Sequence, residues 1–341
     1  MRSHKGVMRA RQALLSFQQI QRSASTAATA TFSPKQETHS VSRSAMLHRN
    51  IKAPPMQVVA SNGTRMRFSN GLEVEDTTCG AAVACLGHGN KRVRQAMIDQ
   101  LDKFAYCNSM FFGHEIGEDL ATELINGTGG LMSKAYIMSS EVMSGMGRCG
   151  TLHAWQQEGV VPDIQTMAKG LGGGFAPVAG MMINHRVAET LSAGSGAFAH
   201  GHTYQGHPLA CAAALEVQRI VREDNLVENV NKNGKILGEL LEQKLGGHPN
   251  VGNVRGKGFF WGIEFVQDKK SKTPFPSAAG IANAVHTKGL MDVGIVLFPG
   301  TGTLDGVEGD HVLIAPAYTS TRDEIVGMVD KVYETVKRSF D

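Results

Sequence analysis

Apolar residues recur along much of the chain at the spacing of a helix face. A helix is expected to begin at Asn90 or Lys91, because the apolar positions that follow recur about every 3.6 residues. These positions are Val93, Met97, Leu101 and Phe104. The same pattern predicts helices over 115–124, 208–221 and 226–245. Thr321 and Glu324 form a capping box that opens a final helix. Its predicted apolar face consists of Ile325, Met328, Val329, Val332 and Val336.

Shorter apolar runs between these helices predict strands. The runs 64–68 and 72–75 flank Ser69-Asn70-Gly71, and Asn-Gly between such runs is a strong hairpin signal. Further strands are expected at 135–138, 259–265, 294–298 and 312–315, and a short run before Lys169 is interpreted as a buried strand. Strands that alternate with helices indicate an α/β protein with a mainly parallel sheet.

Composition narrows the function classes. The chain has 341 residues, 42% of them hydrophobic, and 40 glycines, which favours a glycine-rich α/β enzyme of one large or two ordinary domains. A net charge of +3 is too small to indicate nucleic acid or a membrane surface as partner, and no apolar run approaches the roughly 20 residues that span a bilayer. The five scattered cysteines include no C-x-x-C pair, which argues against a disulfide framework or a zinc site and fits a reducing compartment.

The N-terminal segment, residues 1–44, is different in kind. It is rich in arginine, serine and alanine, and no acidic residue precedes Glu37. Such a composition is typical of a mitochondrial transit peptide, so we expect a mitochondrial protein. The alternative is an unstructured leader on a cytoplasmic protein. Ordered structure is expected to begin near Ala45.

One lysine, Lys169, stands between a short apolar run and a glycine cluster in PDIQTMAKGLGGG. A lysine that performs covalent chemistry needs a partly desolvated setting, so that part of its amine is neutral. Glycines beside it let the backbone pass close to a flat ligand. Most lysines are solvated surface residues, so the neighbouring segments decide the interpretation.

Three further segments accompany Lys169: GAAVACLGHG (80–89), EVMSGMGRCG (141–150) and HGHTYQGHP (200–208). In order and spacing, the four segments resemble the class III (omega-amino acid type) aminotransferases, which are pyridoxal-phosphate enzymes of fold type I. The resemblance implies an α/β fold with a truncated large domain at 106–222. It also implies a smaller α/β domain, built from an N-terminal part at 45–105 and a C-terminal part at 223–341.

The resemblance also implies roles for individual residues. Lys169 would form the Schiff base with pyridoxal 5'-phosphate. Thr203 would reach across a homodimer interface to the phosphate of the partner's cofactor. Gly145, Gly147 and Arg148 resemble the turn after the cofactor-facing strand. The implied substrates are an omega-amino acid or amine as donor and a 2-oxo acid as acceptor.

The resemblance breaks between Ser140 and Glu141. In the family, the segment resembling SKAYIMSS continues into a Gly-Ser/Thr-Glu-Ala turn that holds the cofactor phosphate, and later come a stacking aromatic residue and a strand ending in Asp-Glu-Val. None of these has a counterpart, and Ser140 stands where the family carries the aspartate that keeps the pyridine nitrogen protonated. We interpret the chain as internally shortened, through exon skipping, a gene-prediction error or true divergence. The loss should leave apolar faces of the large domain uncovered.

Two functions are therefore open: pyridoxal-phosphate-dependent transamination, or a non-catalytic subunit that pairs with a full-length homologue. Other interpretations concern single residues. A metal site at His200, His202 and His207 is weakly indicated, because the segment has no acidic residue or cysteine, and we assign no metal. Arg255 is interpreted either as a residue that binds a substrate carboxylate or, more simply, as a residue of a solvated turn. For the aromatic residues Tyr106, Phe111 and Phe112, two interpretations stay open: they line a substrate pocket, or they belong to the core.

Overall fold

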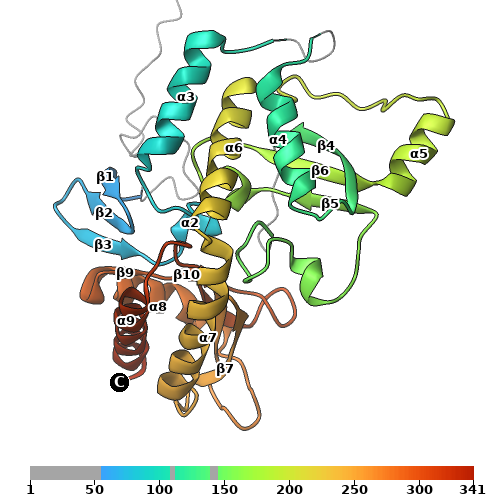
Figure 1. Cartoon of the computed structure of the whole chain (residues 1–341). Coiled ribbons are helices and arrows are strands. Elements are labelled where there is room, and N and C mark those ends of the chain that lie inside the picture. Colours follow the sequence, from blue (N-terminus) through green and yellow to red (C-terminus); the bar gives the residue numbers. More distant parts are fainter. Residues whose placement is uncertain (1–54, 108–111, 139–144) are drawn as a thin grey trace, which may run out of the picture. The chain divides into compact units, whose positions relative to one another are not determined.

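The computed structural model of the chain describes residues 55–107, 112–138 and 145–341 (Figure 1). Its first sheet runs in the order β1-β2-β3-β9, from β1 (Val58–Asn62), β2 (Arg65–Phe68), β3 (Glu73–Asp76) and β9 (Ile295–Val296). β2 and β3 form the predicted antiparallel hairpin. Asn70 closes its turn by accepting a hydrogen bond from Leu72 N at 3.1 Å, and Gly71 adopts a φ of 86°, which explains the Asn-Gly signal.

The second sheet is antiparallel and follows the order β10-β11-β8-β7. Its strands are β7 (Val251–Lys257), β8 (Phe260–Phe265), β10 (Phe298–Gly300) and β11 (Asp310–Ile314). The helices α7 (Leu226–Leu245), α8 (Ile281–Lys288) and α9 (Arg322–Phe340) share a core with it. The capping box at Thr321 is present, and every residue of the predicted apolar face of α9 is buried, so this prediction is confirmed.

The third sheet has the order β4-β6-β5, from β4 (Met132–Met138), β5 (Ile164–Met167) and β6 (Ala179–Asn184). The helices α4 (Glu115–Asn126) and α6 (Pro208–Glu223) pack on it around a core that includes Leu120, Met182 and Leu215. Both strand pairs are antiparallel. The expectation of a mainly parallel sheet is therefore wrong for the described residues, where β3 and β9 form the parallel pair.

The third sheet borders a hollow and has exposed apolar residues at its β5 edge. The hollow measures about 640 Å³ and lies between β4, β6, Ile164 and α5 (His185–Ala193). Ile164 is 52% exposed, and Val160 and Val161 are exposed beside it. The strand predicted before Lys169 is present as β5. The prediction that it is buried is wrong, because only Met167 of its residues is buried. These bare apolar residues agree with the expected loss of neighbouring strand–helix units.

The helix α3 (Lys91–Lys103) begins as predicted, with Asn90 capping the backbone N–H groups of Arg92 and Val93. The predicted apolar face of α3 is only partly buried. Val93 is buried, whereas Leu101 and Phe104 are exposed and Phe104 lies beyond the last helical residue. In the part of the chain that the structure describes, the other short helices are α2 (Cys79–Ala82), η1 (Ala154–Gln157), η2 (Lys169–Leu171), η3 (Ser277–Ala279) and the π-helical η4 (Gly289–Val293).

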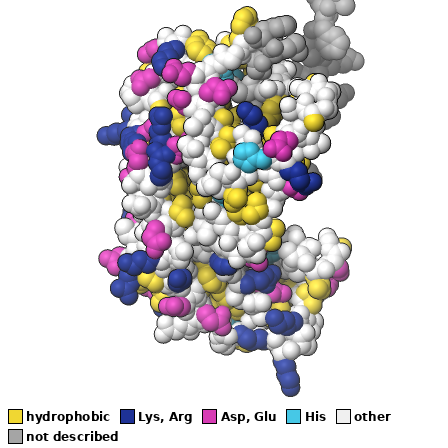
Figure 2. Space-filling model, turned by 45° about the vertical axis from the view of Figure 1, so that its right-hand side comes forward, with side chains coloured by type: hydrophobic (Ala, Val, Ile, Leu, Met, Phe, Trp, Pro, Cys, Tyr) yellow, Lys and Arg dark blue, Asp and Glu magenta, His cyan; other side chains and the backbone are white. Residues whose placement is uncertain are grey.

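In the parts of the chain that the structure describes, no helix is long and apolar enough to cross a bilayer. On the face drawn in Figure 2, basic and acidic side chains are intermixed. The predicted leader lies outside the described residues, so a mitochondrial location stays a prediction, as do the domain boundaries.

Candidate functional site

Lys169 lies at the end of β5, where the strand turns into η2. Its side chain is half-buried, and its backbone has a φ of 46°, in the left-handed region. A residue other than glycine is held there at a cost of about 1–3 kcal/mol, and such strain concentrates at functional sites. The observed backbone therefore favours a functional role for this lysine.

The glycines after Lys169 close a tight turn. The amides of Gly172 and Gly173 donate to Lys169 O at 3.2 and 3.0 Å. A Cβ added to Gly172 would lie 2.4 Å from Val178 Cγ1, so no larger residue fits there without movement. Gly173 and Gly174 have φ values of 56° and 83°, which glycine adopts without strain.

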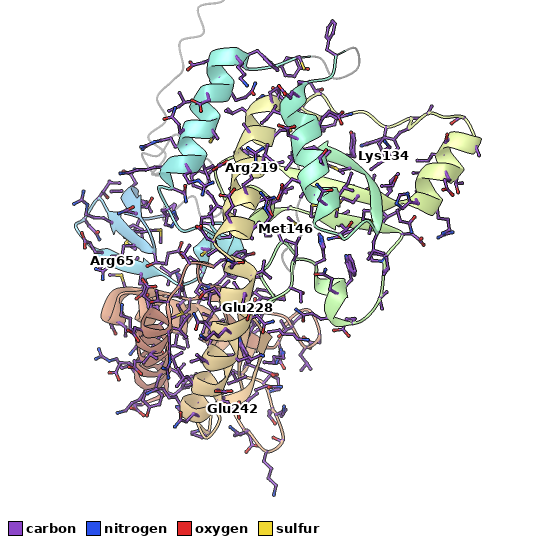
Figure 3. The ribbon with its side chains drawn as sticks, viewed as in Figure 1. Arg65, Lys134, Met146, Arg219, Glu228 and Glu242 are labelled. Atoms are coloured by element: carbon purple, nitrogen blue, oxygen red, sulfur yellow. The ribbon has the colours of Figure 1, made fainter. Side chains whose placement is uncertain are left out.

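A glutamine on α6 holds the same turn from behind. Gln218 Nε2 donates to Gly170 O at 3.0 Å and to Leu171 O at 2.9 Å. Met146, labelled beside α6 in Figure 3, packs against Gly170, because a Cβ on that glycine would lie 3.5 Å from Met146 Cβ. The lysine thus stands on a turn that is fixed by a buried side chain and by packing.

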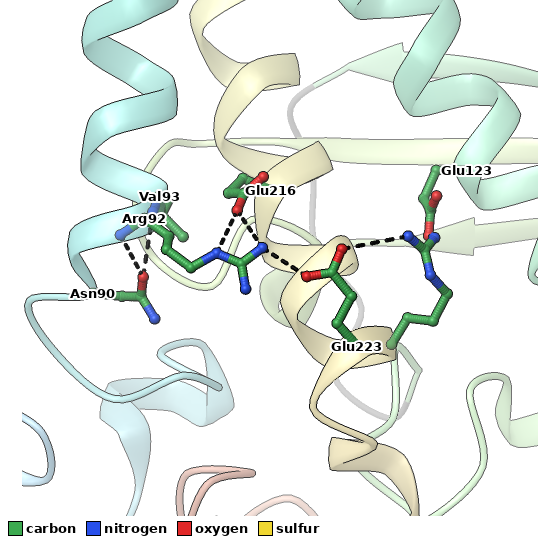
Figure 4. A network of polar contacts seen from close by, with 7 residues as sticks. Asn90, Arg92, Val93, Glu123, Glu216 and Glu223 are labelled. Carbon is green, nitrogen blue, oxygen red and sulfur yellow. Dashed lines mark hydrogen bonds and ion pairs between the residues drawn. The ribbon is translucent and has the colours of Figure 1, made fainter.

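Ion pairs tie α6 to its neighbouring helices (Figure 4). Arg92 of α3 lies 2.8 Å from both Glu216 and Glu223 of α6, and Glu123 of α4 pairs with Arg222 of α6. Exposed pairs of this kind contribute about 0–1 kcal/mol each. They orient the helix that carries Gln218 more than they stabilise it.

Arg148 was predicted to belong to a turn, and the structure shows that its side chain is also fully buried. Its guanidinium lies 4.6 Å from the ring centre of Tyr318, and Nη1 donates to Phe259 O and Pro316 O. Nε and Nη2 have no hydrogen-bond partner among the described residues. A buried arginine of this kind joins the turn at 145–150 to the second sheet and faces no solvent.

Thr203 lies in an exposed loop before α6, and its own side chain is exposed. Tyr106 donates from its hydroxyl to Thr203 O at 3.1 Å. The loop is attached to β4 through Gly206 N, which donates to Ile137 O at 3.0 Å. The structure therefore places the two predicted site residues in different settings, Lys169 half-buried and Thr203 at the surface.

Several secondary interpretations need correction. Tyr106 and Phe112 are exposed rather than part of the core, whereas Phe111 lies outside the described residues. Arg255 lies in β7, not in a turn, and pairs with Glu264 at 2.8 Å. Within the described ranges, no group of three or more histidine, cysteine or acidic residues is arranged to hold a metal ion.

Sequence reasoning missed two polar arrangements. One is the pair of Asp76 and His88, whose carboxylate and ring nitrogen lie 3.1 Å apart next to the Lys169 turn. The other is His153, which is fully buried and stacked on Trp155. Asp76 and His88 are 12 positions apart, and no periodic pattern links them.

A family model and the sequences of similar proteins agree on the family of this chain. The model of the family "Aminotransferase class-III" matches residues 133–334. An aminotransferase of Gibberella zeae is 42% identical over 436 positions, covering 85% of each chain. An uncharacterised aminotransferase of Schizosaccharomyces pombe is 31% identical over 425 positions, covering 83% of this chain and 92% of the relative.

Both alignments are longer than the 341 residues of the chain, so each relative contains stretches with no counterpart here. A solved amine transaminase from an uncultivated Pseudomonas species, in its pyridoxal-phosphate-bound form, matches with a TM-score of 0.80 and 20% identity, covering 87% of this chain and 99% of that one. This likeness establishes the fold, which is that of the fold-type-I transaminases. By its sequence match and its fold, the chain belongs to the class III aminotransferases, a family of enzymes, in an internally shortened form.

Proposed function

We propose that this chain serves the transfer of an amino group from an omega-amino acid or an amine to a 2-oxo acid, with pyridoxal 5'-phosphate attached at Lys169. The observation that carries the proposal is the strained backbone of Lys169 at a strand end, fixed by Gln218 and by the glycine turn. When bound, the cofactor would supply the electron sink for the reaction. The chain would supply the amine of Lys169 that holds it.

The residues around Lys169 fit only one end of this cofactor. The lysine amine suits its aldehyde, but a phosphate needs free N–H donors or a helix N-terminus. The amides of Leu171, Gly172 and Gly173 already donate to carbonyl oxygens of their own turn, and Arg148 is buried away from solvent. The chain also lacks the phosphate-binding turn after Ser139. We therefore assign no catalytic step to the cofactor and expect the isolated chain to transaminate far more slowly than a full-length relative.

A second candidate function is that of a non-catalytic subunit paired with a full-length homologue. It is favoured by the exposed Thr203 and by the bare apolar edge at Ile164. In such a pair, Thr203 would offer its hydroxyl to the phosphate bound by the neighbouring subunit. In a homodimer of this chain, the same hydroxyl would serve the other copy.

Cofactor attachment tests the first proposal. The purified chain is incubated with pyridoxal 5'-phosphate, its visible absorbance is recorded, and the adduct is reduced with borohydride and located by mass spectrometry. We expect a yellow protein labelled at Lys169, no label there in Lys169→Ala, and an unchanged label in Lys270→Ala, which removes an exposed lysine. A colourless protein without label at Lys169 would refute cofactor binding by this chain.

Co-expression tests the second candidate. A tagged copy of this chain is produced together with an untagged full-length aminotransferase, and the complex is isolated through the tag. Stoichiometric recovery of the full-length protein supports the pairing, and Thr203→Ala should then lower the cofactor content of the complex. A monodisperse monomer that recovers none of the full-length protein contradicts it.

A further inference from the structure

A cavity of about 490 Å³ lies beside the turn that carries Lys169. Gly173 and Gly174 form one wall of it, and Gly173 N donates to Lys169 O at 3.0 Å. The opposite walls come from the hairpin at Met66, the segment 76–89, and the β9–β10 segment at 296–299. The cavity therefore joins the first sheet to the lysine turn, although Lys169 itself does not line it.

The cavity contains one buried carboxylate, that of Asp76, which is 2% exposed. Burial alone would raise the pKa of Asp76, but hydrogen bonds from His88 and Thr78 outweigh it and hold the pKa below its ordinary value. Thr78 donates from both its backbone N–H and its hydroxyl, and Gly80 N donates as well. Asp76 is therefore an anion, and within the described ranges no lysine, arginine or glutamate lines the cavity with it.

His88 is oriented by that carboxylate. Its Nε2 lies 3.1 Å from Asp76 Oδ2, and a carboxylate only accepts, so Nε2 carries the proton. In the neutral ring, Nδ1 is then an acceptor, and it has no hydrogen-bond partner among the described residues. The side chain is 25% exposed, so a ligand can reach it.

His286 of α8 lines the same cavity and has a comparable constraint. Its Nδ1 lies 2.6 Å from Leu297 O, and a carbonyl only accepts, so Nδ1 carries the proton. The remaining acceptor is Nε2, which is also unpartnered in the described part of the chain. Both histidines line the cavity, and the hydrogen bond that each makes leaves its second ring nitrogen as an acceptor when the ring is neutral. Among the described residues that line it, Asp76 is the acidic one.

Apart from Ser61 and Thr78, the other walls are mainly apolar or lack side chains. Met66, Val83 and Phe298 supply apolar surface, and glycines at 80, 87, 89, 173 and 174 leave the backbone open. Acceptor nitrogens and a buried negative charge favour a cation that donates hydrogen bonds, and they disfavour an anion. An apolar lining favours a carbon chain attached to that cation.

We propose that this cavity binds a primary alkylammonium group, which donates to His88 and His286 while its carbon chain packs on Met66, Val83 and Phe298. The site is separate from the amine of Lys169 and needs no cofactor.

Isothermal titration of the full chain without pyridoxal phosphate tests the site, with pentylamine as the probe and pentanoate as a probe of equal length and opposite charge. We expect saturable binding of pentylamine and at least tenfold weaker binding of pentanoate. His88→Phe and His286→Phe should each weaken pentylamine binding about 10- to 100-fold, as expected for one charge-assisted hydrogen bond. The matched control is His185→Phe, which changes a histidine on α5, away from the cavity lining.

Val83→Phe is a second variant that fills the cavity without touching its polar groups, and it should abolish pentylamine binding even if the histidine variants fold poorly. Near-ultraviolet circular dichroism checks the fold of each variant. The proposal is overturned if pentylamine does not bind or if the two probes bind equally. It is also overturned if the Val83→Phe and His286→Phe proteins bind pentylamine as the His185→Phe control does. None of these results depends on whether the chain transaminates.

Discussion

Gln218 fixes the turn that carries Lys169, so replacing it with methionine should weaken that turn. Its Nε2 donates to Gly170 O and Leu171 O, and the side chain is buried. Methionine has a similar length and no donor, so Gln218→Met removes both hydrogen bonds with little change in volume. Gly170 O keeps a weak donor, Cys85 Sγ at 3.5 Å, whereas Leu171 O loses its amide partner. Two lost hydrogen bonds and one poorly satisfied buried oxygen amount to about 2–4 kcal/mol.

Urea unfolding followed by circular dichroism measures this loss. The matched control is Gln100→Met, which removes a buried glutamine whose Nε2 donates once, to Phe104 O at 3.0 Å, and should lose about 1 kcal/mol. Gln218→Met should therefore unfold at a clearly lower urea concentration than Gln100→Met. If the two variants unfold together, the double hydrogen bond does not hold the lysine turn and the reasoning fails.

Three further predictions follow from single contacts. Gly172→Ala should lower the free energy of unfolding by about 1–3 kcal/mol, because its Cβ would lie 2.4 Å from Val178 Cγ1. The control is Gly145→Ala, whose Cβ meets open space and should leave the melting temperature nearly unchanged. Equal melting temperatures of the two variants would contradict this prediction. Burial lowers the pKa of His153 from 6.5 to about 4, so the unfolded chain takes up this proton first as the pH falls. Between pH 6.5 and about pH 4, this group should lower the free energy of unfolding by up to about 3 kcal/mol. In urea unfolding measured across this pH range, His153→Phe should therefore lose less stability than the unmodified chain. An equal loss in both proteins would contradict the prediction. Thr321→Ala should lose about 1 kcal/mol with the cap of α9, and an unshifted melting curve would show that the cap contributes nothing.

Local sequence signals predicted elements well where a few neighbouring residues settle the outcome. Asn70 and Gly71 sit in the hairpin turn, and Thr321 starts α9, because turn and cap chemistry involves residues within three positions of one another. Burial was harder to predict. Leu101 has the right helical spacing but is exposed, since spacing defines a face of a helix and not what packs against it.

The candidate site shows the same division. Lys169 could be found from its glycines and from the segments around it. Gln218, which holds the lysine turn, is 48 positions from Gly170, and no local pattern connects them. The pair of Asp76 and His88 was likewise invisible, because both residue types are common and their contact arises from the path of the chain between them.

By itself, the sequence determined the family, the identity of Lys169 as the candidate amine and the break between Ser140 and Glu141, because motif order and missing residues can be read without coordinates. Only the tertiary structure decided that β4, β5 and β6 pair antiparallel, that Ile164 lies exposed at a sheet edge, and that Asp76, His88 and His286 share one cavity. The physical reason is that strand pairing, burial and cavity shape depend on contacts between segments far apart in the chain. Those contacts are set by packing of the whole fold and not by the residues next to each site.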